Sequence, residues 1–163
     1  MKIDLLYLQF NIERLMANIR SLLVIDDDKD DFDLIAEAVQ LIDPTIEVSF
    51  LDRCADAHLY KHHSFDLVFL DINMPQHDGF SWLKGIRESG YEDLPIIMYT
   101  NSLRPEHIMQ AYKEGANLYY AKPTSFNDLI KGLKEIISFD WSDPLSITEA
   151  YAYNGHYSIF KVA

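Results

Sequence analysis

The stretch that decides the fold is Phe65-Asp66-Leu67-Val68-Phe69-Leu70-Asp71-Ile72-Asn73-Met74-Pro75, followed by Gln76-His77-Asp78-Gly79. Its apolar run is typical of a strand buried on both faces, and Pro75 and Gly79 indicate a turn just after it. Asp71 therefore ends a core strand on its carboxyl side. In open α/β sheets, ligands bind at that edge.

A second apolar run also ends in acidic residues. Ser21-Leu22-Leu23-Val24-Ile25 leads directly into Asp26-Asp27-Asp28. Because the carboxyl ends of parallel strands meet at one edge of a sheet, the two runs together predict a single acidic pocket.

Short apolar runs alternate with segments of helical spacing between about Arg20 and Phe139. The runs are Leu22–Ile25, Ile46–Phe50, Leu67–Leu70, Pro95–Tyr99 and Leu118–Ala121. Apolar stripes lie between them at Phe32, Ile35, Ala36 and Val39; at Phe80, Leu83 and Ile86; at Ile108, Ala111 and Tyr112; and at Leu129, Ile130, Leu133 and Ile137. A fifth and weaker helix is predicted at Cys54–His63. This alternation predicts an α/β fold with a five-stranded parallel sheet. Right-handed crossovers make it doubly wound, with helices on both faces.

The starts of three helices carry their own signals. Asp52, Asp78 and Ser125 each stand just before a predicted helix. Their side-chain oxygens suit the N-cap position, where they accept hydrogen bonds from free backbone N–H groups.

The chain divides into an N-terminal extension (1–19), the α/β domain (20–140) and a C-terminal tail (141–163). In the extension, apolar residues recur at helical spacing, namely Leu5, Leu8, Ile12, Leu15, Met16 and Ile19. Two interpretations stay open there, an amphipathic helix and a poorly ordered segment. A helix would dock on the domain or pair with a second copy in a homodimer.

The C-terminal tail is rich in aromatic residues. Asn154-Gly155 stands between Thr148–Tyr153 and His156–Val162, a pattern that predicts a hairpin. An isolated hairpin is marginal in water, so this one needs a surface to pack on. The aromatic residues that suit such a contact are Trp141, Tyr151, Tyr153, Tyr157 and Phe160.

Composition excludes several classes of function. The formal net charge of −12 argues against direct binding to nucleic acid, whose phosphates require Lys and Arg. A single cysteine, Cys54, excludes an internal disulfide and a cysteine-cluster zinc site. No stretch is apolar enough to span a membrane, and residues 1–19 do not resemble a signal peptide. We therefore expect a cytoplasmic protein that does not engage membranes.

Two further strand ends complete the predicted pocket. Thr100 ends the fourth apolar run with a hydroxyl group, and Lys122 ends the fifth with a cation. Each lies where its strand reaches the edge that carries Asp71. Periodicity alone does not predict that chemically active residues stand at so many strand ends.

These residue types predict a magnesium site. Crowded carboxylates repel one another, and a divalent cation relieves this. Mg²⁺ prefers oxygen ligands and usually keeps several waters. We expect Asp27, Asp71 and the backbone carbonyl of Asn73 to ligate it, with Asp26 acting through a water.

The same pocket predicts phosphoryl transfer. A carboxylate is a known nucleophile for forming an aspartyl-phosphate, and Asp71 is the candidate acceptor. Phosphoryl transfer depends mostly on positioning and charge neutralisation. Lys122 offers a second positive charge, and the hydroxyl of Thr100 offers a hydrogen bond.

The motifs together resemble the receiver domain of bacterial response regulators. They are Leu23-Val24-Ile25-Asp26-Asp27-Asp28, Leu70-Asp71-Ile72-Asn73-Met74-Pro75-Gln76-His77-Asp78-Gly79, Tyr99-Thr100, Gly115-Ala116 and Lys122-Pro123, in the order and spacing of that family. With no output domain beside it, the chain is most similar to the single-domain, chemotaxis-regulator-like members. The resemblance implies a flavodoxin-like fold, an Mg²⁺ cofactor, and a phosphohistidine donor on a histidine kinase or phosphotransfer protein.

The resemblance also implies a switch that acts on a downstream protein. The hydroxyl residue matching Thr100 moves toward the phosphoryl group, and the aromatic residue matching Tyr119 turns inward. Tyr120 is the neighbouring alternative, and spacing favours Tyr119. The face formed by the fourth helix, fifth strand and fifth helix then changes its affinity for partners. Asn101 departs from the small residue usual in the family, and Pro123 is a candidate for a cis peptide bond.

Three alternatives stand beside a terminal signalling switch. One is a phosphorelay intermediate that passes the group from Asp71 to another histidine. Another is an aspartate-nucleophile phosphatase, but such enzymes carry a second Asp where this chain has Asn73, which cannot act as an acid or base. The third is a phosphate-independent interaction module, which the intact set of pocket residues disfavours. We therefore expect a switch with phosphorylation and dephosphorylation chemistry at Asp71, not a conventional enzyme.

Overall fold

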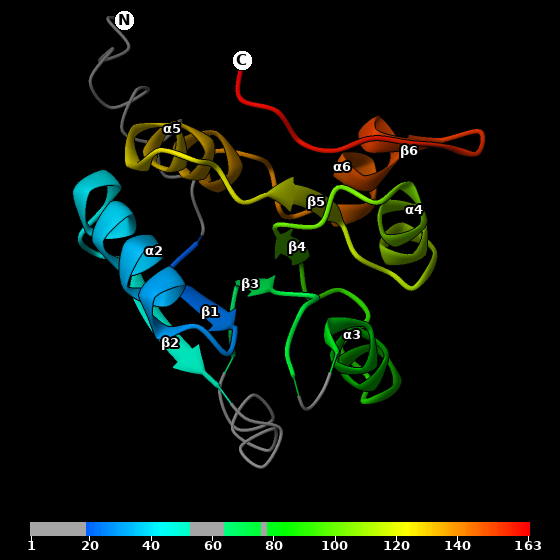
Figure 1. The fold of residues 1–163 in the computed structure, drawn as a ribbon, viewed down its shortest axis with the longest axis horizontal. Coiled ribbons are helices and arrows are strands. Elements are labelled where there is room, and N and C mark those ends of the chain that lie inside the picture. Colours follow the sequence, from blue (N-terminus) through cyan, green and yellow to red (C-terminus); the bar gives the residue numbers. More distant parts are fainter. Residues whose placement is uncertain (1–18, 53–63, 76–77) are drawn as a thin grey trace, which may run out of the picture.

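The computed structural model describes residues 19–52, 64–75 and 78–163 (Figure 1). The helices predicted in the N-terminal extension and at Cys54–His63 lie outside the described residues. Within the described part of the chain, no helix is both long and apolar enough to cross a membrane.

Five parallel strands form the central sheet, as the alternating pattern predicted. They are β1 (Ser21–Ile25), β2 (Glu47–Leu51), β3 (Leu67–Leu70), β4 (Ile96–Thr100) and β5 (Leu118–Ala121). Their order is β2-β1-β3-β4-β5. This is the flavodoxin-like order of a doubly wound sheet, whose switch point lies between β1 and β3.

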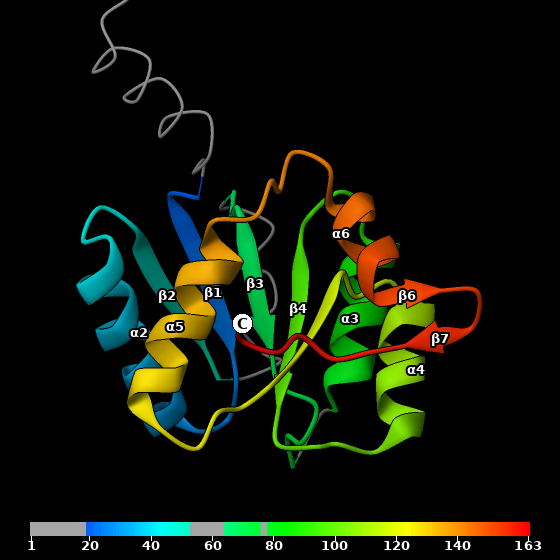
Figure 2. The same cartoon turned by 90° about the horizontal axis from the view of Figure 1, so that it is seen from above.

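Helices cover both faces of the sheet (Figures 1 and 2). They are α2 (Lys29–Ile42) and α5 (Phe126–Ile137) on one face, with α3 (Gly79–Glu88) and α4 (Pro105–Lys113) on the other. Successive strand residues alternate between the two layers, so Phe69 packs toward α2 and α5 while Val68 packs toward α3. Burial on both faces explains why the strands read as continuous apolar runs and not as alternating ones.

The helix starts follow the predicted capping chemistry. The side chain of Asp78 accepts a hydrogen bond from the N–H of Ser81, and the side chain of Ser125 accepts one from Asp128, so both predicted N-caps are confirmed. Asp28 caps α2 in the same way. Asp52 is followed by residues that are not described.

The C-terminal tail differs in part from its prediction. Residues Pro144–Tyr151 form helix α6, so the expected strand from Thr148 is wrong. Asp143-Pro144 is the start of a helix because Asp143 caps it and Pro144 takes its first position, where a missing N–H costs nothing. The hairpin turns at Asn154-Gly155, but its strands β6 (Ala152–Tyr153) and β7 (His156–Tyr157) have only two residues each.

Gly79 stands where α3 meets the loop after β3, and it permits a close approach. Its N–H donates to the carbonyl of Ile72 at 3.0 Å, and a Cβ at Gly79 would overlap the backbone carbonyl of Asp71. Replacing Gly79 with Ala should therefore lower the free energy of unfolding by about 1–3 kcal/mol, because the backbone must shift to admit the methyl group.

Gly85 is the matched control in the same helix, since a Cβ there meets no atom within 4 Å apart from its chain neighbours and the nearby backbone of its own helix. Gly85→Ala should stabilise the protein by up to about 1 kcal/mol, because Ala favours helix over Gly. Urea denaturation measures both changes. Equal effects of the two substitutions would contradict the close approach at Asp71.

Candidate functional site

The predicted site residues meet at the carboxyl edge of the sheet. Asp26 and Asp27 follow β1, Asp71 follows β3, Thr100 ends β4, and Lys122 follows β5. Because all five strands are parallel, these positions share one edge. The strand ends therefore bring the predicted residues together.

Three carboxylates form a cluster at this edge. One carboxylate oxygen from each of Asp26, Asp27 and Asp71 lies within 4.8 Å of the others. Asp26 and Asp71 are buried and Asp27 is exposed. A buried set of oxygen donors open to solvent on one side fits a hard cation such as Mg²⁺. Asn73 is exposed beside this cluster, and its predicted carbonyl contribution stays a prediction.

Backbone N–H groups fix the orientation of the two buried carboxylates. Ile72 N donates to Asp71 Oδ1 at 2.8 Å, and Asp28 N donates to Asp26 Oδ1 at 2.9 Å. Each bond occupies Oδ1 of its carboxylate, and Oδ2 of both Asp26 and Asp71 lies toward the ammonium group of Lys122. The local backbone thus holds the carboxylates in place before any ligand binds.

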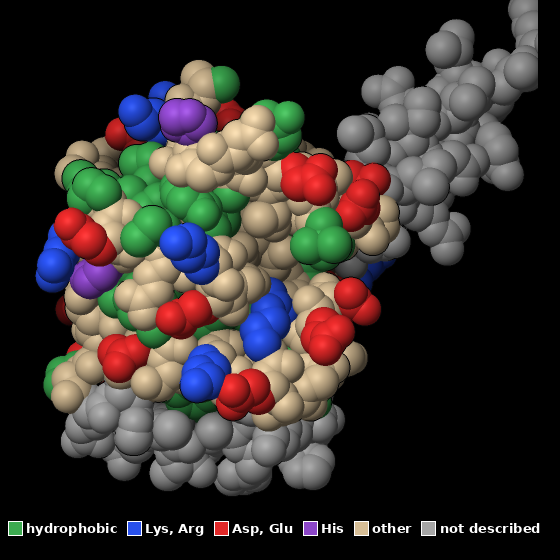
Figure 3. All heavy atoms as spheres, turned by 90° about the vertical axis from the view of Figure 1, so that its right-hand side faces the viewer, with side chains coloured by type: hydrophobic (Ala, Val, Ile, Leu, Met, Phe, Trp, Pro, Cys, Tyr) green, Lys and Arg blue, Asp and Glu red, His purple; other side chains and the backbone are tan. Residues whose placement is uncertain are grey.

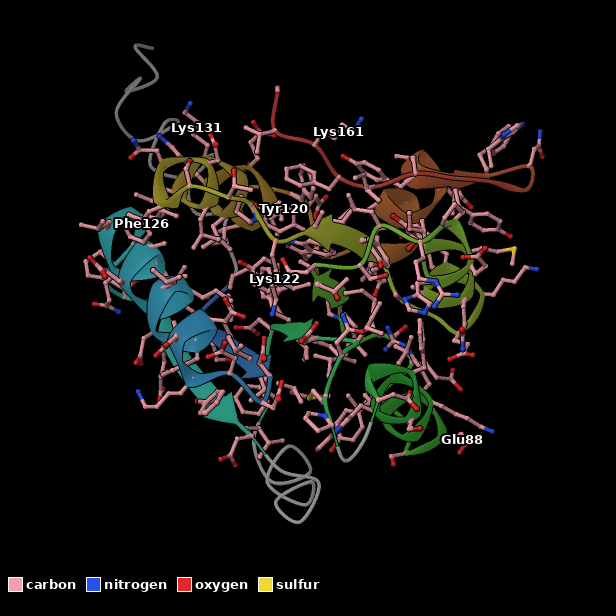
Figure 4. All side chains as sticks on the ribbon, in the orientation of Figure 1. Glu88, Tyr120, Lys122, Phe126, Lys131 and Lys161 are labelled. Atoms are coloured by element: carbon pink, nitrogen blue, oxygen red, sulfur yellow. The ribbon has the colours of Figure 1, made fainter. Side chains whose placement is uncertain are left out.

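The side chain of Lys122 extends from the end of β5 toward β1 and β3 (Figure 4), where it pairs with two members of this cluster, Asp26 and Asp71. Its side chain is 6% exposed, and its Nζ donates to Asp26 Oδ2 at 2.8 Å and to Asp31 Oδ2 at 2.7 Å. Asp71 Oδ2 lies 3.5 Å away. Burial alone lowers the pKa of Lys122, but the bonds to the carboxylates outweigh it and raise that pKa above its usual value. The ammonium group therefore stays charged.

Asp26 is the carboxylate most affected by burial. Desolvation raises its pKa to about 6, although hydrogen bonds from Lys122 and the N–H of Asp28 favour the ionised form. The group therefore changes charge close to neutral pH.

Asp31 is a site residue that sequence reasoning missed. It does not follow a predicted strand, so the strand-end pattern did not include it in the pocket. In the structure its carboxylate binds Lys122 from the first turn of α2. A signal was available, because Asp31 stands four residues before the buried Ile35 and so shares the inward face of the helix.

Thr100 and Tyr119 are linked through the backbone of Ser102. Thr100 is fully buried, and its Oγ1 accepts hydrogen bonds of 3.3 Å from Asn73 Nδ2 and from Ser102 N. The hydroxyl of Tyr119 donates to the carbonyl of Ser102 at 2.9 Å. Burial raises the pKa of Tyr119 to about 12, so its hydroxyl stays a donor.

The structure also shows the positions of three residues near Thr100 and Tyr119 in the sequence, namely Asn101, Tyr120 and Pro123. Tyr119 packs in the layer of α3 and α4, whereas Tyr120 packs in the opposite layer with α5. Asn101 is exposed. The peptide bond before Pro123 is trans, so the expected cis bond is wrong.

The motifs that place this pocket also define a family. Residues 22–134 match the family model of the response regulator receiver domain. The chain belongs to that family. Its receiver domain is 34% identical over 80 residues to a chemotaxis protein CheY homolog of Campylobacter jejuni, covering 48% of this chain and 62% of that protein. It is 29% identical over 116 residues to the transcriptional regulatory protein RprY of Bacteroides fragilis, covering 71% of this chain and 48% of RprY. The matches thus span less than two thirds of either relative.

Solved receiver structures share the architecture. The chemotaxis protein CheY4 of Vibrio cholerae superposes with a TM-score of 0.63 at 27% identity, covering 72% of this chain and 98% of that one. The Mn²⁺-bound form of the response regulator Rcp1 gives a TM-score of 0.64 at 25% identity, covering 74% and 93%. The receiver family belongs to two-component signalling.

Neutralising Asp27 should have opposite effects with and without metal. In metal-free protein, Asp27→Asn removes repulsion among carboxylates that lie within 4.8 Å, so we expect a higher melting temperature than in the parent. Mg²⁺ at one hundred times its dissociation constant should stabilise the parent by about 2.7 kcal/mol, and the variant should gain almost nothing at that concentration. Thermal unfolding with Mg²⁺ and with a chelator measures both. Asp30→Asn, an exposed change three residues later in the first turn of α2, should keep the parent's response. A full Mg²⁺ shift in Asp27→Asn would count against this site.

Magnesium affinity should fall as the pH drops through about 6, because protonated Asp26 offers no negative charge. In metal-free protein, lowering the pH has the opposite, favourable effect on the free energy of unfolding. The folded state binds this proton more tightly than the unfolded chain, whose Asp has a pKa of 3.8, so this group adds stability as the pH falls from 7. Calorimetric titration in buffers of different ionisation enthalpy measures the released proton. The fall in Mg²⁺ affinity near pH 6 should be absent in Asp26→Asn. If the variant shows the same fall, another group must be responsible for it.

Proposed function

We propose that this receiver domain is a phospho-acceptor switch in which Asp71 takes a phosphoryl group from a phosphohistidine on a histidine kinase or phosphotransfer protein. One observation carries the proposal. One oxygen of the buried Asp71 carboxylate lies within 4.8 Å of one oxygen each of Asp26 and Asp27, and Asp71 Oδ2 lies 3.5 Å from the ammonium of Lys122. A nucleophile beside a cation site and a fixed positive charge supports phosphoryl transfer.

The proposed reaction forms one bond and breaks another. A carboxylate oxygen of Asp71 bonds to phosphorus while the P–N bond of the phosphohistidine breaks, and the imidazole leaves with the bonding electrons. Mg²⁺ held by Asp27, Asp71 and the backbone carbonyl of Asn73, with Asp26 acting through a water, would neutralise charge on the phosphoryl oxygens. Lys122 lies 3.5 Å from Asp71 Oδ2 and would pair with the same oxygens. The hydroxyl of Thr100 would donate a hydrogen bond to them.

We propose that the result is a change in partner binding. The acyl phosphate adds negative charge beside Thr100, whose hydroxyl is joined to Tyr119 through Ser102. A local charge change of this kind biases a two-state element. The downstream partner would be a protein that reads the surface around α4 and β5. The single Cys54 and the kinase donor fit a cytoplasmic place of action.

The side chain of Asn73 argues against a phosphatase. Its amide donates to Thr100 Oγ1, and an amide cannot transfer the proton that hydrolysis of the intermediate requires. The phosphoryl group should therefore persist on Asp71. Transfer from the phosphorylated chain to a histidine phosphotransfer protein would separate a phosphorelay intermediate from a terminal switch.

Incubation with acetyl phosphate and Mg²⁺ should add a single phosphoryl group, because acetate is a leaving group that needs no kinase. Intact mass measures the adduct, and alkaline hydroxylamine should remove it as an acyl phosphate. Asp71→Asn and a chelator control should stay unmodified. An adduct that survives in Asp71→Asn would place the acceptor elsewhere. No adduct on a parent that binds Mg²⁺ would contradict the proposal and favour a phosphate-independent module.

A further inference from the structure

The C-terminal segment lies along the outer edge of β5. This strand is last in the order β2-β1-β3-β4-β5, so the five-stranded sheet leaves its outer backbone groups unpaired. Tyr120 of β5 pairs with Phe160 in a parallel bridge. Figures 1 and 2 both show the end of the chain running beside β5 toward α5. The segment 158–162 thus meets the edge of the sheet at one parallel bridge, the kind of backbone contact that peptides extend in β-augmentation.

Phe160 anchors the segment in the core. Its side chain is 3% exposed, and its ring makes an edge contact with Tyr120 at 5.2 Å between centroids. Phe139 and Tyr151 surround the same ring. At the end of the chain, Ala163 N donates to Glu135 Oε1 of α5 at 3.2 Å. The segment is therefore held by one buried aromatic group and by backbone bonds on either side of it.

Both backbone groups of Tyr119 are bonded to this arrangement. Phe160 N donates to the carbonyl of Tyr119 at 2.7 Å. Tyr119 N donates to the hydroxyl of Tyr112 at 3.1 Å, and that hydroxyl donates in turn to the carbonyl of Ser158 at 2.8 Å. Tyr119 is thus fixed on its outer side by the C-terminal segment.

The side chain of Tyr119 links the C-terminal segment to the pocket by hydrogen bonds. Its hydroxyl holds the carbonyl of Ser102, and the N–H of Ser102 bonds to Thr100 Oγ1. Asn73 Nδ2 bonds to the same oxygen. With two bonds accepted, the hydroxyl of Thr100 has its own proton left to donate. A continuous series of bonds therefore joins the docked segment to Thr100 through Tyr119 and Ser102.

We propose that the outer edge of β5, together with Tyr112, is a binding site for an extended peptide with an aromatic anchor, that the chain's own residues 158–162 are its resident ligand, and that their docking supports phosphorylation of Asp71 by holding Tyr119. The last part rests on the proposed function. A downstream protein that reads this side of the domain meets the docked segment and not a bare strand edge.

The neighbouring surface fits such a contact. On the side that carries α3, α4 and the β6–β7 hairpin, hydrophobic side chains gather toward the hairpin end (Figure 3). Tyr157 of the hairpin stacks on Tyr112 of α4 at 6.1 Å between centroids. Asn117 Nδ2 donates to Thr148 Oγ1 of α6 at 3.2 Å. The elements before the segment are thus docked on the same edge and deliver Phe160 to it.

Docking and phosphorylation can be measured on the same samples. Backbone amide exchange by NMR reports whether Phe160 N–H is bonded, and intact mass reports the rate of modification by acetyl phosphate. Phe160→Ala removes the anchor, and Tyr112→Phe removes the bridging hydroxyl while keeping the ring. Tyr153→Ala, at 67% exposure in the same tail, is the control.

In both test variants, the backbone N–H at position 160 should exchange at least about tenfold faster than in the parent, because local opening no longer breaks the anchored contact. Phosphorylation should be several-fold slower. Tyr153→Ala should match the parent in both measurements. A peptide of residues 156–163 at millimolar concentration should bind Phe160→Ala and recover its rate, whereas the parent's tethered segment excludes that peptide.

Other results would overturn the inference in distinguishable ways. Free exchange of Phe160 N–H in the parent would overturn the docking itself. Fast exchange in the variants with parental phosphorylation rates would overturn the coupling and leave the proposed function standing. Protection that depends on protein concentration would assign the segment to a second copy. No adduct on the parent would overturn the proposed function, and the coupling with it, while exchange would still decide the docking.

Discussion

The ammonium group of Lys122 is the contact on which the active edge of this domain depends. Asp26, Asp27, Asp31 and Asp71 bring four carboxylates to one corner of a chain whose net charge is −12. Lys122 comes from β5 and pairs with Asp26 beyond β1, so one cation ties the two halves of the sheet together across its switch point. Burial of Asp26 disfavours its charge, and the paired cation limits that cost. The same pairing places the ammonium group 3.5 Å from Asp71 while Asp26 and Asp31 accept its two shorter bonds.

Much of the fold follows from simple features of the sequence. The strands are continuous apolar runs because both faces of a parallel sheet are covered, and Asp78 and Ser125 mark helix starts because their oxygens accept free N–H groups. The secondary structure of the C-terminal tail was harder to predict. Asp143-Pro144 is equally typical of a turn and of an N-cap followed by the first helical residue. Local signals do not separate these two conformations, and the helix that forms also receives a tertiary hydrogen bond from Asn117 to Thr148.

The site was predictable to the extent that it sits at strand ends. Asp71, Thr100 and Lys122 each end a run, and parallel topology brings such residues to one edge. Asp31 was missed because its role depends on how α2 lies over that edge, which a strand-end rule does not describe. The spacing from Lys122 indicated Tyr119 and not Tyr120, but no local pattern shows that the two rings enter opposite layers or that the backbone of Tyr119 carries the C-terminal segment.

An edge strand requires some cover, and how this domain covers β5 bears on how it signals. A strand edge left bare invites pairing with other chains, and the bridge between Phe160 and Tyr120 covers part of this edge from within the chain. In the proposed arrangement, the C-terminal segment is hydrogen-bonded to the backbone of Tyr119 through Phe160. The side chain of Tyr119 is in turn hydrogen-bonded to Ser102, which leads to the pocket. Coupling between two sites is reciprocal, so a group on Asp71 that is favoured by the docked segment must in turn strengthen that docking. A partner that competes for the β5 edge would then shift the same equilibrium as the phosphoryl group, the docking and release of residues 158–162. Its binding would be sensed at Asp71 even though the two never touch.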